Sequence, residues 1–166
     1  FVHQPWWGDY AKLNGYFGRA GMLLAEGEEP VAAKTVIICS GAHHRALGAP
    51  GEDRLTGKGV SYCAVCDGNF YRGRDVAVVG GGNSALEESL YLSRIVNKVY
   101  LIHRREGFRG SKVYQDKIAA MPDKIELVTS HVVDELQGKD DLEALVARHV
   151  ETGATRVIPV EGVFVY

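Results

Sequence analysis

The sequence predicts an α/β fold with three layers, and three features of one segment indicate it. Residues 75–79 (DVAVV) and 98–103 (KVYLIH) are short runs of apolar and β-branched residues, which is typical of buried strands. Three glycines at 80–82 follow the first run directly, and residues 83–94 have apolar positions at helical spacing. Strand, glycine turn, helix and strand within about 30 residues form a βαβ unit, in which the strands are parallel and the crossover is right-handed.

Further elements are predicted on both sides of this unit, and those that follow it include antiparallel strands. They are a buried strand at 35–39, a Gly- and Pro-rich connection at 43–59, a helix at 111–121, a bent strand at 125–136, a hairpin of 142–150 with 156–160, and a strand that starts at 163. Pro122 ends the helix, and Gly153 lies in the hairpin turn. Because the composition changes within the connection, we place a domain boundary near residue 49. Residues 1–33 follow no clear period.

Composition narrows the classes of function. The chain has 166 residues, 46% hydrophobic and 24% charged, with a formal net charge of −2. This nearly neutral chain lacks the basic field that favours nucleic acid or an acidic membrane surface. It also lacks a run of about 20 apolar residues and a recognisable signal peptide. We therefore expect no nucleic-acid partner, no membrane partner and a cytoplasmic location. Since the chain does not begin with Met, we expect a piece of a longer protein.

The glycine turn matches the pattern G-x-G-x-x-A of dinucleotide-binding sites. Gly80 allows a tight turn, Gly82 allows a pyrophosphate to approach the backbone, and Ala85 allows close packing of helix on strand. Asn83 and Ser84 lie in the first helical turn, where N–H groups and the helix dipole bind anions. With a strand before it and a helix after it, the pattern predicts a Rossmann-like domain. The alternative is that the glycines only form a tight turn.

The end of the next strand carries arginines where an NAD-binding domain usually has an acidic residue. His103, Arg104 and Arg105 occupy this position, and Arg109 follows. Guanidinium groups bind a phosphate through paired hydrogen bonds, so this arrangement favours NADPH with its 2′-phosphate over NADH. The alternative is a solvated basic turn, which is what charge runs usually are.

Two of the three cysteines form a C-x-x-C pair. Cys63 and Cys66 can form a small disulfide ring that opens and closes readily, and Asp67 is placed to exchange a proton with the thiol that leaves. The alternative is a structural zinc site, in which Cys39 with His43 or His44 would complete four ligands. No second cysteine pair at metal spacing is present, so we expect no metal.

Taken together, three motifs resemble those of the low-molecular-weight thioredoxin reductases, which are FAD- and NADPH-dependent pyridine nucleotide-disulfide oxidoreductases. Residues 59–68 (GVSYCAVCDG) resemble the redox segment of that family. Residues 80–88 (GGGNSALEE), which include Glu87, resemble its NADPH fingerprint. Residues 103–109 (HRREGFR) resemble its 2′-phosphate clamp. The motifs occur in the family's order and spacing, and the resemblance covers residues 30–166.

The resemblance implies an enzyme in which electrons pass from NADPH through FAD to the Cys63–Cys66 disulfide and on to thioredoxin or a thioredoxin-like protein. In the family the second cysteine, here Cys66, faces the flavin, and the first, here Cys63, attacks the partner disulfide. A homodimer and a rotation of the NADPH domain between steps are also implied.

The resemblance further implies three regions. Residues 1–48 would be part of an FAD domain, residues 49–158 the NADPH-binding domain with the C-x-x-C pair, and residues 159–166 the start of the return to the FAD domain. The glycine fingerprint for FAD is absent from this chain. FAD would therefore be bound mainly by other segments, and we expect this chain not to complete turnover alone.

Two other kinds of function compete with this interpretation. A flavin-dependent dithiol oxidase or a ferredoxin-linked reductase shares the cysteine pair but needs no 2′-phosphate clamp, so the three arginines argue against it. A non-catalytic NADP(H)-binding module needs no cysteine pair, so Cys63 and Cys66 argue against it.

Overall fold

The computed structural model describes residues 22–23, 31–32 and 43–166. The chain forms two compact units, residues 1–42 and residues 43–166. In the first unit, β1 (Met22–Leu23) pairs antiparallel with β2 (Val31–Ala32). The strand predicted at 35–39, which contains Cys39, lies outside the described residues.

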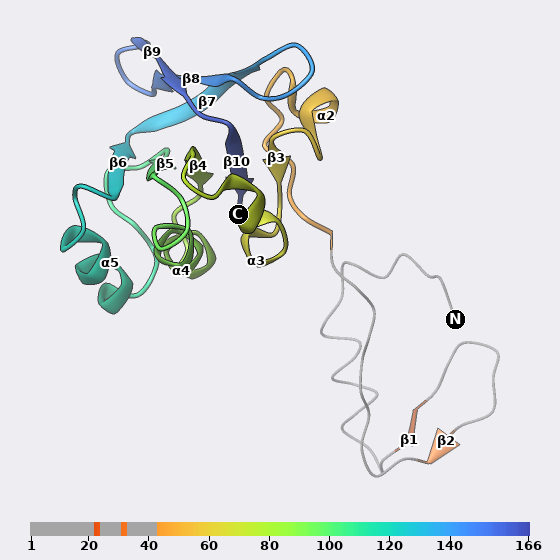
Figure 1. The fold of residues 1–166 in the computed structure, drawn as a ribbon. Helices are drawn as coiled ribbons and strands as arrows, with labels where there is room; N and C mark the ends of the chain where they lie inside the picture. Colours follow the sequence, from red (N-terminus) through yellow and green to blue (C-terminus); the bar gives the residue numbers. More distant parts are fainter. Residues whose placement is uncertain (1–21, 24–30, 33–42) are drawn as a thin grey trace. The chain divides into compact units, whose positions relative to one another are not determined.

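Five parallel strands form the central sheet of the second unit (Figure 1). In spatial order they are β3 (Val60–Ser61), β10 (Gly162–Val165), β4 (Asp75–Val79), β5 (Lys98–His103) and β6 (Ile125–Thr129). In the register of β4 with β5, Ala77 lies opposite Tyr100, and α4 (Asn83–Leu92) connects the two strands. The predicted βαβ unit is therefore confirmed.

A second sheet contains three antiparallel strands, β7 (His131–Gln137), β8 (Ala144–His149) and β9 (Thr155–Pro159). The predicted hairpin is confirmed as β8 with β9. The prediction of one bent strand at 125–136 is wrong, because β6 and β7 belong to different sheets. Ser130 lies between them with a φ of 57°, a left-handed conformation that redirects the chain out of the parallel sheet.

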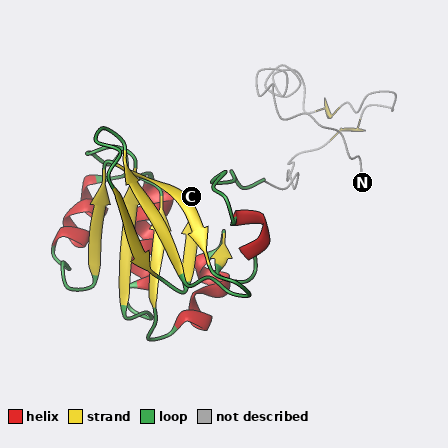
Figure 2. Cartoon of the chain, turned by 90° about the horizontal axis from the view of Figure 1, so that it is seen from above, coloured by secondary structure: helices red, strands yellow, loops and turns green. Residues whose placement is uncertain are grey.

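Helices cover one face of the parallel sheet, and the antiparallel sheet covers the other (Figure 1). Figure 2 shows the strands of both sheets in yellow and the helices in red. α4 packs on β4 and β5, and α5 (Lys112–Ala119) packs on α4. Three short helices lie in the connections near β3, namely α2 (Glu52–Leu55), α3 (Ala64–Asp67) and the 3-10 helix η1 (Gly68–Tyr71). Among the residues that the structure describes, no helix is long and apolar enough to cross a membrane.

The alternation of side chains along β4 explains why two hydrophobic cores form. Val76 and Val78 pack with Leu86 of α4 in one core, whereas Ala77 packs with Leu145 of β8 in the other. Successive side chains of a strand point to opposite faces, so a strand covered on both faces must be apolar throughout. This is the pattern by which the sequence predicted the strand.

The last residues of the chain are part of the same sheet. β10 falls in the segment 159–166, where the sequence predicts the start of a return to another domain, and it lies between β3 and β4, with Val163 opposite Ala77. The second compact unit accordingly extends from residue 43 to residue 166. The place of a strand in a parallel sheet depends on partners far away in the sequence, which a local pattern does not reveal.

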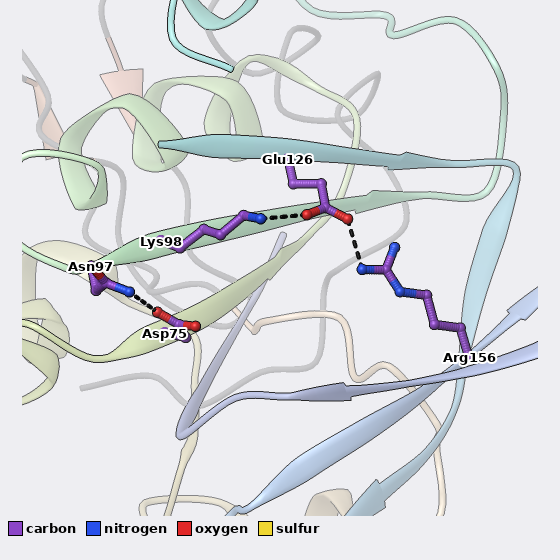
Figure 3. A network of polar contacts seen from close by, with 5 residues as sticks. All are labelled: Asp75, Asn97, Lys98, Glu126 and Arg156. Atoms are coloured by element: carbon purple, nitrogen blue, oxygen red, sulfur yellow. Dashed lines mark hydrogen bonds and ion pairs between the residues drawn. The ribbon is translucent and has the colours of Figure 1, made fainter. Parts of the chain in front are cut away.

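A polar network connects the two sheets (Figure 3). Glu126 of β6 accepts hydrogen bonds from Lys98 of β5 at 2.5 Å and from Arg156 of β9 at 2.8 Å. Burial alone would raise the pKa of the Glu126 carboxyl, but the hydrogen bonds from Lys98 and Arg156 lower it below its usual value. The same hydrogen bond between Lys98 and Glu126 raises the pKa of Lys98. The network is therefore ionised at neutral pH.

Candidate functional site

The glycine turn lies at the carboxyl end of β4, where α4 begins. A side chain at Gly80 would lie 2.7 Å from the Cβ atom of Ala85 and 2.8 Å from the carbonyl oxygen of Tyr166, so this position has no room for one. Gly82 borders open space, since a Cβ atom there would meet no atom within 4 Å. The turn is thus packed closely at Gly80 and Ala85 and open at Gly82, as a backbone cradle for a pyrophosphate requires.

The first turn of α4 faces solvent beside this open space. Asn83 and Ser84 are exposed, Ala85 is buried, and Glu87 is exposed further along the helix. Gly82 is the N-cap residue and supplies no side-chain hydrogen bond. The first N–H groups of a helix have no intrahelical acceptor, and the helix dipole favours an anion there.

His103 lies beneath the glycine turn. A Cβ atom at Gly81 would lie 2.2 Å from the ring of His103, which is 7% exposed and stacks on Phe108 with 5.2 Å between ring centroids. Burial lowers the pKa of His103, and the charges of the neighbouring arginines lower it further, against a backbone hydrogen bond with Gly107 that raises it. Its Nε2 atom has no hydrogen-bond partner among the described residues. The imidazole therefore supports the turn from below as a neutral ring, unlike the arginines that follow it.

Arg104, Arg105 and Arg109 are exposed in the connection between β5 and α5. In the described part of the chain, the ion pairs involve other cations. The structure thus brings three guanidinium groups, which form no ion pair among the described residues, to the carboxyl end of the strand next to the glycine turn. Such an arrangement suits a phosphate group.

The two cysteines form a disulfide at the start of α3, with 5.3 Å between their Cα atoms. Cys63 is the N-cap residue of α3, and its sulfur accepts a hydrogen bond from the Cys66 N–H at 3.2 Å. Cys66 is exposed and Cys63 is half-buried. Beside them Val65 is 61% and Phe70 76% exposed, so the disulfide is bordered by accessible apolar surface.

Asp67 is held near the disulfide by Ser61. The Ser61 hydroxyl donates a hydrogen bond to the Asp67 carboxylate at 2.6 Å and accepts one from the Cys63 N–H at 3.1 Å. One side chain of β3 therefore positions both the first cysteine and the carboxylate that the sequence suggested for proton exchange.

Tyr166 contacts both motifs. Its carbonyl oxygen lies against Gly80, and its hydroxyl accepts a hydrogen bond from the Ala64 N–H at 2.9 Å. Burial raises the pKa of Tyr166 to about 12, and the negative charges of Glu88 and Asp67 contribute in the same direction. Tyr166 is therefore a neutral phenol that links the glycine turn to the start of α3.

Sequence reasoning missed three polar residues of this region, namely Ser61, Tyr166 and Glu88. Glu88 has an oxygen atom without a hydrogen-bond partner in the described residues, and burial, together with the charge of Glu87, raises its pKa. Ser61 is two residues from Cys63, which was a usable signal. Tyr166 is about a hundred residues from the disulfide and gave none.

The described residues contain no group of three or more His, Cys, Asp and Glu side chains placed to hold a metal ion. The zinc alternative requires Cys39, which lies outside them, and free thiols at Cys63 and Cys66, which here are bonded to each other.

A glycine turn and an accessible disulfide in one α/β unit define a nucleotide-binding oxidoreductase domain. Residues 12–166 match the family model described as pyridine nucleotide-disulphide oxidoreductase. The chain belongs to this family.

Within the family, the chain is similar to thioredoxin reductases. It is 42% identical over 151 residues to the thioredoxin reductase of Listeria monocytogenes, covering 90% of this chain and 47% of that protein. It is 47% identical over 133 residues to that of Streptomyces coelicolor, covering 80% and 41%. The crystal structure of the enzyme from Streptococcus pyogenes matches with a TM-score of 0.74 and 45% identity, over 84% of this chain and 46% of the other. The chain thus spans about half the length of the curated relatives it matches.

Proposed function

We propose that this chain is the part of a thioredoxin-disulfide reductase that holds NADPH and carries the redox-active disulfide. The observation that supports this most directly is the presence of an accessible Cys63–Cys66 disulfide and an open glycine turn in one compact unit, with Tyr166 in contact with Gly80 and with Ala64, which lies between the two cysteines in the sequence. The similarity to thioredoxin reductases supports the same function.

The residues present fit NADPH. The open space at Gly82 would receive the pyrophosphate, with Gly80 and Ala85 shaping the turn and the first turn of α4, at Asn83 and Ser84, facing it. The exposed Arg104, Arg105 and Arg109 would hold the 2′-phosphate. FAD would be held mainly by residues other than those described here. When bound, NADPH supplies a hydride and FAD transfers its two electrons to the disulfide.

The chain's own residues then transfer these electrons to a protein disulfide. The Cys63 thiolate attacks a sulfur of the partner disulfide, which forms a mixed disulfide and releases one partner thiolate. The Cys66 thiolate attacks the Cys63 sulfur, which restores the Cys63–Cys66 bond and releases the second thiolate. Asp67, oriented by the Ser61 hydroxyl, exchanges a proton with the thiol that leaves when the Cys63–Cys66 disulfide opens.

The proposal also covers the partner, the oligomeric state and the location of the full-length protein. Thioredoxin or a thioredoxin-like protein is the partner, the full-length protein is a homodimer, and its location is cytoplasmic. The exposed Val65 and Phe70 beside the disulfide supply accessible surface for a protein partner.

Calorimetric titration of this chain with NADP⁺ and with NAD⁺ at one ionic strength tests the nucleotide site. We expect tighter binding of NADP⁺. We expect Arg104→Ala combined with Arg105→Ala to weaken NADP⁺ binding about tenfold to a hundredfold, the scale of lost hydrogen bonds between charged groups, and to change NAD⁺ binding little. The control is Arg94→Ala, which removes an exposed arginine at the other end of α4. Equal losses for the two nucleotides would contradict the clamp.

A further inference from the structure

The arginine-bearing connection folds back onto the glycine turn and is attached to it by its second half. The carbonyl oxygen of Gly81 accepts hydrogen bonds from the N–H groups of Arg109, at 2.9 Å, and Gly110, at 3.1 Å. The side-chain oxygen of Asn83 accepts a third hydrogen bond, from the Ser111 N–H at 2.7 Å. Three consecutive backbone donors of the connection are therefore held by the turn and the first residue of α4.

Packing reinforces this attachment. A Cβ atom at Gly110 would lie 2.4 Å from a methyl carbon of Leu86, so the backbone of the connection packs closely on this side chain of α4. The Gln115 side chain of α5 donates a hydrogen bond to the Gly110 carbonyl oxygen at 2.8 Å. By contrast, residues 104–107 are exposed.

The last of the three hydrogen bonds, the one from Ser111, is made by the side chain of Asn83. The other two acceptor contacts use the Gly81 carbonyl, which every residue type has, whereas the acceptor for Ser111 is the amide oxygen of one particular side chain. Asn83 is expected from the sequence to take part in cofactor binding, and its side-chain oxygen also accepts this hydrogen bond from the connection.

We propose that Asn83 is a specificity-determining positioning residue, whose hydrogen bond to the Ser111 N–H holds the arginine-bearing connection, and with it Arg109, in place for the 2′-phosphate of NADP(H). The inference rests on the proposed nucleotide site. The preference for NADP(H) over NAD(H) then depends on a residue that need not touch the 2′-phosphate. NAD(H) has no such phosphate, so movement of Arg109 affects its binding little.

The test uses two variants and one control on this chain. Asn83→Ala removes the acceptor, and Asn83→Asp retains an acceptor oxygen at a helix start, where a carboxylate is favourable. The control, Asn97→Ala, removes an exposed asparagine that bonds Asp75 at the opposite end of β4 and β5. For each protein, hydrogen exchange at the amides of residues 109–111 is measured without nucleotide, and binding of NADP⁺ and NAD⁺ is measured by calorimetry.

We expect Asn83→Ala to speed amide exchange at Ser111 and to lower NADP⁺ affinity roughly threefold to tenfold, the scale of one neutral hydrogen bond, while NAD⁺ affinity changes less than about twofold. Asn83→Asp should restore the slow exchange and the ratio of the two affinities, although its charge repels the pyrophosphate of both nucleotides. Asn97→Ala should match the wild-type chain.

The outcomes separate the inference from the proposed function. Unchanged exchange at Ser111 in Asn83→Ala would overturn the inference whatever the nucleotide results, and so would equal losses of NADP⁺ and NAD⁺ affinity. If the wild-type chain itself shows no preference for NADP⁺, the proposed clamp fails, and with it the specificity role of Asn83.

Discussion

The imidazole of His103 lies between Gly81 and the ring of Phe108, with 7% of the residue exposed. At an exposed position, a histidine gains and loses a proton near neutral pH. Here burial, together with the charges of the neighbouring arginines, lowers the pKa of His103. The ring beneath the open glycine turn is therefore uncharged at neutral pH.

This burial makes the stability of the unit depend on pH. Below the ordinary histidine pKa of 6.5, the unfolded chain takes up a proton at His103 that the folded chain resists. The free energy of unfolding should therefore fall as the pH falls below 6.5, until the lowered pKa of the folded state is reached. We expect His103→Gln and His103→Asn to reduce this fall, measured by urea denaturation above and below pH 6.5. An unchanged pH dependence in both variants would show that His103 is not its source.

At the scale of elements, the contact between the parallel and antiparallel sheets is partly polar. Glu126 of β6 bonds Lys98 of β5 and Arg156 of β9, and the charged ends of Lys98 and Arg156 also lie 4.9 and 6.0 Å from the Tyr100 ring centroid. Their side chains are 29–49% exposed, so solvent screens these ion pairs and each contributes modestly.

We expect Glu126→Gln to lower the free energy of unfolding by about 1 kcal/mol at neutral pH, because it removes the charge from two partly exposed ion pairs. The pKa of Glu126 is lowered in the folded state, so this stabilisation is present above the usual carboxyl value of 4.5 and is lost as the pH falls through the lower folded value. Urea denaturation at neutral pH and below pH 4.5 measures both effects.

The matched control is Asp116→Asn, which removes the partner of Lys112 within α5, where the two side chains are 61% and 81% exposed. It should change stability little. If the control and Glu126→Gln are equally destabilising at neutral pH, the network does not hold the sheets together.

At the scale of the whole molecule, the two chemical motifs occupy one unit, and under the proposed function they perform separate steps. The glycine turn and the arginines would receive the nucleotide, whereas Cys63 and Cys66 lie at the start of α3 with exposed surface beside them. A change at the disulfide should therefore affect electron delivery without affecting nucleotide binding.

In the full-length protein, we expect Cys63→Ser to abolish reduction of a protein disulfide but to leave reduction of the flavin by NADPH intact. The first is measured with thioredoxin as substrate and the second by flavin absorbance under anaerobic conditions. Cys39→Ser, a cysteine outside the C-x-x-C pair, is the control for loss of a thiol. Retained disulfide reduction in Cys63→Ser would rule out the redox role, and loss of flavin reduction would show that the change is not confined to the disulfide.

The sequence alone determined the features that depend on neighbours along the chain. The βαβ unit, the glycine turn and the position of the arginines were predictable because strand periodicity, helix periodicity and turn geometry are local. The spacing of Cys63 and Cys66 likewise restricted the pair to a small disulfide ring or half of a metal site. These local signals were also sufficient to indicate the family.

Only the tertiary structure decided the features that depend on contacts between distant segments. The turn at Ser130 separates a segment of continuous strand-like composition into two sheets, and β10 lies inside the parallel sheet, between β3 and β4. Likewise, Asn83 bonds Ser111, and Tyr166, which follows β10, bonds Ala64, which follows the neighbouring strand β3. Burial and hydrogen-bond partners follow from which segments pack together, and a sequence pattern carries no direct record of that packing.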